Sequence, residues 1–123
     1  MSPSNAAREA LVAVVLCVSA AVASAAPLTF PGIPAATRQT FRYACEGGET
    51  FEVSYWNTAN GQSFALVPVK GRRLLFVNTI AGSGARYQAD RYTWWTKGPR
   101  ADLYDATGGE NAPPIVAGCV EQH

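Results

Sequence analysis

The sequence predicts an all-β domain of about eight short antiparallel strands, arranged as a sandwich or, as we favour, a small closed barrel. Apolar and polar residues alternate with period two through several short runs, the pattern of a strand with one buried face. Gly, Asn, Asp and Pro separate these runs at intervals of about ten residues. No segment after the leader shows the apolar period of an amphipathic helix. A closed barrel is favoured because it leaves no strand edge exposed.

The strands are predicted in order along the chain. Phe41 and Tyr43 begin the first alternation, which a Gly-Gly turn separates from the second. In the second run Phe51, Val53 and Tyr55 share one face, so a half-buried strand is expected there. By the same reasoning, strands are expected over residues 63–69, 72–80, 85–89, 92–96, 101–104 and 115–120, with a polar loop over 107–114.

Residues 1–25 predict a cleaved secretory signal peptide and not part of the fold. A short basic start is followed by an apolar run over residues 10–22 and by an Ala-Ser-Ala cleavage triplet. The run is shorter than the roughly 20 residues that span a bilayer, so cleavage is favoured over an uncleaved membrane anchor. Cys17 is not expected to carry lipid, because Leu16 precedes it where a lipid-attachment site needs a small residue.

The rest of the chain divides into a leader and one domain. Residues 26–37 are rich in proline and predict a flexible leader, and residues 38–123 predict the folded domain. After cleavage the chain keeps Cys45 and Cys119, near the two ends of that domain. In an oxidising compartment these two most simply form a disulfide; two free thiols are the less favoured alternative.

Composition excludes several functional classes. The chain has 10 Lys and Arg residues against 9 Asp and Glu, whereas a general nucleic-acid binder carries a basic excess. Its single histidine, His123, is the last residue, and it has only 3 cysteines, so metal sites and histidine-dependent catalysis are hard to build. We therefore expect no metal, no cofactor and no nucleic-acid partner.

Two local features are candidates for function. Ser83 lies between Gly82 and Gly84, a pattern that predicts an open loop with the hydroxyl at its tip; the alternative is a hairpin turn without a role. Serine hydrolysis is not expected, because no histidine base accompanies the serine. Lys97 follows a pair of tryptophans and precedes a glycine, so its ammonium can project from a rigid strand end. Its alternative is an ordinary solvated lysine beside two core tryptophans.

Taken in order, these features resemble the bacterial periplasmic and membrane-bound inhibitors of c-type lysozyme. The resemblance spans residues 43–119 and rests on Tyr43-x-Cys45, a Phe-x-Val strand, Ser83-Gly84-x-x-Tyr87, Trp95-x-Lys97-Gly98, Ala101-x-Leu103 and the closing Cys119.

The resemblance implies an eight-stranded antiparallel barrel that inserts a loop into the active-site cleft of a c-type lysozyme. Ser83 and Lys97 would contact the catalytic carboxylates of the enzyme, with Gly84 in the serine motif and Tyr87 bracing the loop. The missing lipid-attachment signal places the chain nearer to the soluble branch of the family. We therefore expect a soluble periplasmic protein without a stable membrane anchor after cleavage.

Two other functional classes compete with this one. A barrel of this size can instead carry a small apolar ligand in its interior, lined by the many aromatic residues. An enzyme is not expected, because solvated loop charges account more simply for the scattered acids Asp90, Asp102, Asp105 and Glu110.

Overall fold

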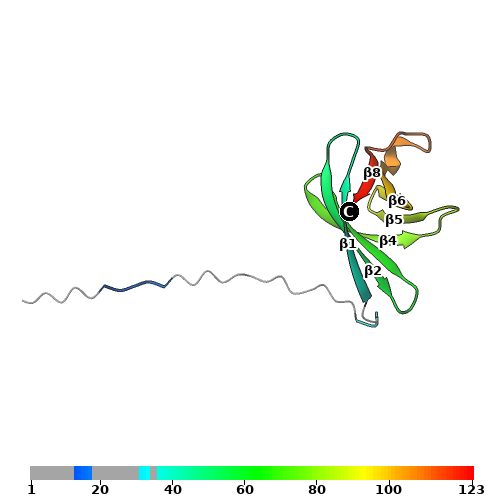
Figure 1. The fold of residues 1–123 in the computed structure, drawn as a ribbon. Helices are drawn as coiled ribbons and strands as arrows, with labels where there is room; N and C mark the ends of the chain where they lie inside the picture. The colour runs from blue at the N-terminus through cyan, green and yellow to red at the C-terminus, as the bar shows by residue number, and fades with distance from the viewer. Residues whose placement is uncertain (1–12, 18–30, 34–35) are drawn as a thin grey trace, which may run out of the picture.

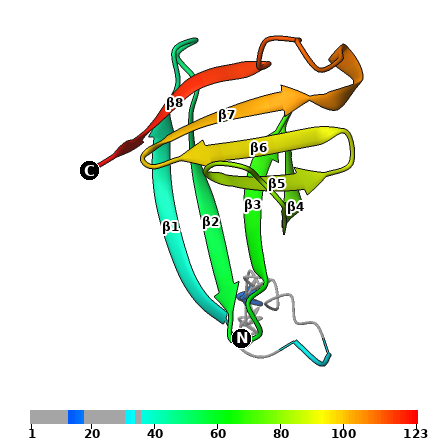
Figure 2. The same cartoon turned by 90° about the vertical axis from the view of Figure 1, so that its right-hand side faces the viewer.

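The structure is a computed structural model that describes residues 13–17, 31–33 and 36–123. Eight antiparallel strands form a closed barrel in which each strand pairs with its neighbour in sequence and the last returns to the first (Figure 1, Figure 2). The prediction of an all-β, eight-stranded antiparallel barrel is therefore confirmed. The strands are β1 (Ala36–Ala44), β2 (Thr50–Thr58), β3 (Ser63–Val69), β4 (Arg72–Thr79), β5 (Ala85–Ala89), β6 (Tyr92–Lys97), β7 (Arg100–Asp105) and β8 (Val116–Gln122), with one short 3-10 helix, η1 (Ala106–Gly108), before β8.

The first strand begins inside the segment predicted as a flexible leader. Ala36 and Thr37 pair with Thr58 and Asn57 at the end of β2, so they belong to the barrel. This pairing joins residues far apart in sequence, and local proline content therefore gave no sign of it. Most of the predicted signal peptide and leader lies outside the described residues. In the described part of the chain, no helix is long and apolar enough to cross a membrane.

Aromatic side chains fill the interior of the barrel. Trp94 is fully buried, its ring stacks edge-on against Tyr43 at 5.3 Å between centroids, and its indole N–H donates to the Tyr55 hydroxyl at 2.8 Å. The hydroxyls of Tyr43 and Tyr55 share a further hydrogen bond of 2.7 Å. Burial raises the pKa of Tyr55 to about 12, and burial also raises the pKa of Tyr43, so both phenols are neutral at physiological pH. Side chains thus occupy the space in which a carrier would hold its ligand.

A disulfide joins Cys45 to Cys119, 74 residues apart in sequence, as predicted. Cys45 directly follows β1 and Cys119 lies within β8, so the bond crosses the junction at which the barrel closes. That junction is short, because β8 pairs with β1 only over residues 42–44. The disulfide therefore reinforces a closure that rests on three paired residues.

Candidate functional site

Ser83 lies in the loop between β4 and β5, over residues 80–84. Cross-strand pairing of β4 with β5 ends at Thr79 and Arg86, so the loop extends past the ladder. Ser83 is exposed, and Ile80 at the start of the loop is 95% exposed. The backbone carbonyl of Ser83 accepts a hydrogen bond of 2.9 Å from the indole N–H of Trp95, on β6. This bond ties the tip of the loop to the neighbouring strand.

Gly84 brings the loop against the end of β6. Its φ is +64°, a left-handed conformation that glycine adopts without penalty. A β-carbon at this position would overlap the backbone carbonyl oxygen of Thr96 and lie 2.9 Å from the Cγ of Lys97. Only a glycine allows this approach, and through it the Ser83 and Lys97 positions come to the same end of the barrel.

We expect Gly84→Ala to reduce the stability of the barrel. The alanine must leave the left-handed conformation or adopt it at a cost of about 1–2 kcal/mol, and it must also push the loop off the backbone at Thr96. Urea unfolding should show this loss of free energy of unfolding.

Gly71→Ala is the control, because Gly71 has a similar φ of +79° but open space around its missing β-carbon. If the two variants lose equal stability, the close approach of Gly84 to Thr96 adds nothing to the cost of the left-handed backbone.

Lys97 ends β6 as an exposed cation without an acidic partner in the described structure. Its Nζ lies 4.4 Å from the centre of the Trp95 ring, and the Cζ of Arg86 lies 4.6 Å from the same ring. Among the described residues, no carboxylate lies within the 4.0 Å of an ion pair from either cation. Both positive charges are therefore free to attract acidic groups of another molecule.

Tyr87 lies on the inner side of β5, opposite to the outer side that carries Arg86. Its side chain is only 7% exposed, its ring centre is 5.6 Å from that of Tyr55, and burial raises its pKa. From there it can support β5 only through the core, and it offers no surface to a partner. Its role as a brace for the loop remains a prediction.

Sequence reasoning missed Trp95 and Arg86 as parts of this site. Trp95 was grouped with Trp94 as a core residue, but successive residues of a strand point to opposite faces. Because Trp94 points into the core, Trp95 must face outward, where the strand register sets it directly across from Arg86. The alternation along the strand already indicated that Trp95 faces outward. That Arg86 on β5 lies across from it follows only from the strand register.

Two of the four acids named as candidates for an enzyme site, Asp105 and Asp102, are bound to other groups of the barrel. Asp105 is bound to Arg91 at 2.7 Å and caps η1 through the backbone N–H of Thr107, and the arginine holds the pKa of this carboxyl well below its usual range. Asp102 accepts a hydrogen bond of 2.7 Å from the backbone N–H of Gly118. Within the described ranges, no group of three or more His, Cys, Asp or Glu residues could hold a metal.

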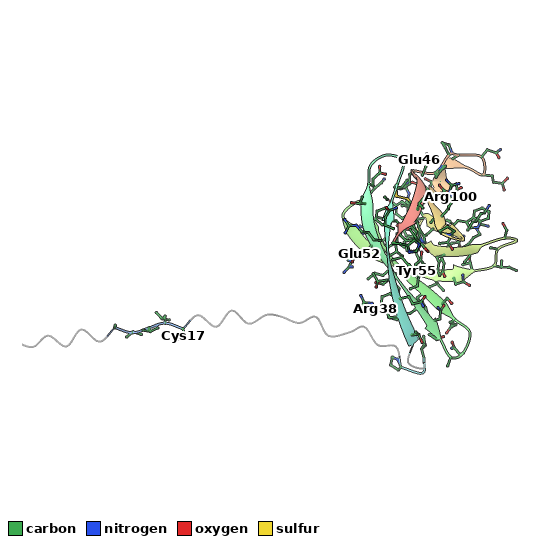
Figure 3. All side chains as sticks on the ribbon, viewed as in Figure 1. Cys17, Arg38, Glu46, Glu52, Tyr55 and Arg100 are labelled. Carbon is green, nitrogen blue, oxygen red and sulfur yellow. A yellow bond between two sulfur atoms is a disulfide. The ribbon has the colours of Figure 1, made fainter. Side chains whose placement is uncertain are left out.

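A shallow cavity of about 240 Å³ lies on the outside of the barrel between β7 and β8. Glu46 and Arg100 line it on the same side of the molecule as β8 (Figure 3), together with Asp102. Lys97, Ser83 and Trp95 do not line this cavity, but it borders their site, because Asp102 lies across from Trp95 in the pairing of β6 with β7.

The family model for the membrane-bound lysozyme-inhibitor of c-type lysozyme matches residues 43–112, more than half of the chain. The chain belongs to this family. A protein of Cupriavidus necator named membrane-bound lysozyme inhibitor of C-type lysozyme is 40% identical over 114 residues, covering 89% of this chain and 86% of the relative. A Pseudomonas aeruginosa protein of the same name is 45% identical over 97 residues, covering 77% and 74%.

Two solved structures share the fold. Pseudomonas aeruginosa MliC, crystallised in complex with hen egg white lysozyme, matches with a TM-score of 0.64 and 36% identity, over 80% of this chain and 96% of that one. PliC-St, the periplasmic lysozyme inhibitor of C-type lysozyme from Salmonella typhimurium, matches with a TM-score of 0.59 and 25% identity, over 69% and 98%. The resemblance inferred from the sequence motifs is thereby confirmed.

The predicted localisation is wrong. The family description and the names of both curated relatives say membrane-bound, whereas the sequence analysis expected a soluble periplasmic protein. The expectation rested on Leu16 before Cys17, outside the barrel. The motifs between Tyr43 and Cys119 could not correct it, because the barrel has the same fold in a periplasmic inhibitor and in a membrane-bound one.

Proposed function

We propose that this protein inhibits a c-type lysozyme by inserting the β4–β5 loop into the active-site cleft of the enzyme. In this proposal the Ser83 hydroxyl and the Lys97 ammonium contact the catalytic carboxylates. The observation that carries it is the approach of Gly84 to Thr96 and Lys97, which sets an exposed hydroxyl and an exposed cation at one end of a rigid barrel. The P. aeruginosa relative crystallised with hen egg white lysozyme supports the choice of enzyme.

The chemistry of the two groups fits such a cleft. A retaining glycosidase uses two carboxyl groups about 5 Å apart, one as acid and one as nucleophile. Opposite charges about 4 Å apart attract by roughly 4 kcal/mol at an effective dielectric constant near 20, before desolvation is subtracted. In the free protein Lys97 forms no ion pair within the described structure, so binding to a partner breaks none. The hydroxyl of Ser83 can donate a hydrogen bond to the second carboxyl group.

Replacing Ser83 with alanine tests the hydroxyl contact. The hydroxyl makes no hydrogen bond within the described structure, where only the Ser83 carbonyl is bonded, so the thermal midpoint should stay unchanged. Hydrogen bonds to charged groups contribute about 1.5–3 kcal/mol, so inhibition should weaken by about tenfold or more. The measurement is the rate of cell-wall lysis by hen egg white lysozyme at increasing inhibitor concentration.

Ser63→Ala is the control, since its hydroxyl is already bonded to Asn57 within the fold. Full potency of Ser83→Ala would remove this hydroxyl from the interface. A Ser83→Ala variant that unfolds would assign the serine a structural role only.

A further inference from the structure

We propose that Trp95 is the positioning residue of this site, holding the Ser83 loop through its N–H group and the Lys97 ammonium through its ring face. This inference rests on the proposed inhibition of lysozyme and deepens it. The fully buried Trp94 fills the core, whereas Trp95 stands on the outer face of β6 between the two candidate residues.

The indole N–H of Trp95 gives the β4–β5 loop a hydrogen bond to the neighbouring strand. Cross-strand pairing stops at Thr79 and Arg86, and no turn hydrogen bond between backbone groups is found at residues 80–84 of the described structure. The bond of 2.9 Å from the indole to the Ser83 carbonyl therefore holds the tip of an otherwise unbonded loop. Without it, the loop must be ordered at the moment of binding, which lowers affinity.

The ring face holds the lysine without neutralising it. A cation within about 6 Å of an indole ring is attracted by the negative face of the ring, and the Lys97 Nζ lies at 4.4 Å. A carboxylate in the same place would hold the ammonium as well but would cancel its charge. The ring restricts the flexible lysine stem while its full positive charge remains available for the carboxylates of a partner.

Arg86 adds a second positive charge at the same ring. Its Cζ lies 4.6 Å from the ring centre, and its Nε is buried with no hydrogen-bond partner among the described residues. Two cations beside one indole repel each other, so each gains when an anionic group approaches. Trp95 thus brings two cations to the ring that also holds the Ser83 loop, and Asp102 across from it on β7 is engaged by the backbone N–H of Gly118.

Two variants separate the two functions of Trp95. Trp95→Phe keeps a ring face but removes the N–H group, and Trp95→Leu removes both. Inhibition of hen egg white lysozyme should weaken about tenfold in Trp95→Phe and about hundredfold in Trp95→Leu. Trp56→Phe is the matched control, because Trp56 also lies beside an arginine, Arg38 at 5.5 Å, on a strand away from the loop; its inhibition should equal that of the wild type.

A double-mutant cycle shows whether Trp95 acts through the loop. In the Ser83→Ala background, Trp95→Phe should cost less than about threefold, because the hydroxyl that the indole positions is already gone. An equal loss in both backgrounds, or a loss no greater than that of Trp56→Phe, would overturn the positioning role.

A measurement without lysozyme keeps the inference separate from the proposed function. By NMR, the Trp95 indole N–H should be protected from exchange, and the Lys97 side-chain protons should be shifted upfield by the ring, an effect absent in Trp95→Leu. If these signals are missing, the positioning role is refuted whatever the partner is. If they are present but the wild-type protein inhibits no c-type lysozyme, the proposed function fails while the positioning of Lys97 and Ser83 stands.

Discussion

Lys97→Ala is expected to weaken lysozyme inhibition by about thirtyfold or more, mainly through faster dissociation. Removing one partner of a buried charge pair costs about 2 kcal/mol or more, because the other charge stays buried without compensation. Lys97 is exposed and has no acidic partner in the described part of the barrel, so the free inhibitor should keep its thermal midpoint. Association and dissociation rates measured by surface plasmon resonance would separate the two contributions.

The pH dependence of inhibition tests whether Lys97 contacts the acid glutamate of lysozyme. The acid glutamate of lysozyme has a pKa raised to about 6, and a nearby ammonium favours its ionised form and so lowers that pKa. Binding then releases protons, and inhibition should strengthen as the pH rises through about 6 and level off above it. Lys97→Ala should lose this rise.

The control for the lysine is Lys70→Ala, at the turn between β3 and β4. This variant should keep both the potency and the pH dependence of the wild-type protein. Wild-type inhibition constants that are flat between about pH 5 and 7.5 would contradict a contact between Lys97 and the glutamate.

Replacing both Cys45 and Cys119 with serine is expected to remove about 4 kcal/mol from the free energy of unfolding. The bond closes a loop of 74 residues, so its loss returns much conformational freedom to the unfolded chain. It also crosses the short β1–β8 junction, where β8 pairs only with residues 42–44 of β1. Since small domains are stable by only about 5–15 kcal/mol, the variant should unfold at a much lower urea concentration.

A reducing agent is the control for the thiol chemistry, because Cys45 and Cys119 form the disulfide of the barrel. It should lower the unfolding midpoint of the wild-type protein and leave that of the double serine variant unchanged. A wild-type midpoint that does not move when the disulfide is reduced would contradict a stabilising role for the bond.

The strand pattern could be predicted because burial in a sheet imposes a local rule. Val53 and Tyr55 lie in the core of the barrel, and Glu52 and Trp56 on the opposite face are exposed or half-buried. Ser54, on that same outer face, is buried and hydrogen-bonded to Arg38 and Thr40. The start of β1 could not be predicted in the same way. Ala36 joins the strand because Thr58 lies across from it, and nothing in the neighbouring residues of the leader indicates that pairing.

The candidate site was predictable only in part. Ser83 and Lys97 were singled out by local composition and by the resemblance, and the structure sets both near Gly84. Trp95 was not predicted as part of the site, because a tryptophan next to Trp94 resembles a core residue until the two faces of the strand are distinguished. The membrane attachment of the family was also not predicted, since the motifs that carry the resemblance all lie within the barrel.

The sequence by itself determined the alternation that predicts the strands, favoured the pairing of Cys45 with Cys119 and carried the resemblance to the family. Each of these depends on residue type and on spacing along the chain. Only the tertiary structure decided that Ser83, Arg86 and Lys97 meet at one indole. These residues come from different segments, and the register between β5 and β6 and the close approach at Gly84 bring them together. Lys97 and Trp95 share a face because they lie two residues apart on β6, but the contacts of Ser83 and Arg86 with Trp95 arise from strand pairing across the barrel, which no local pattern encodes.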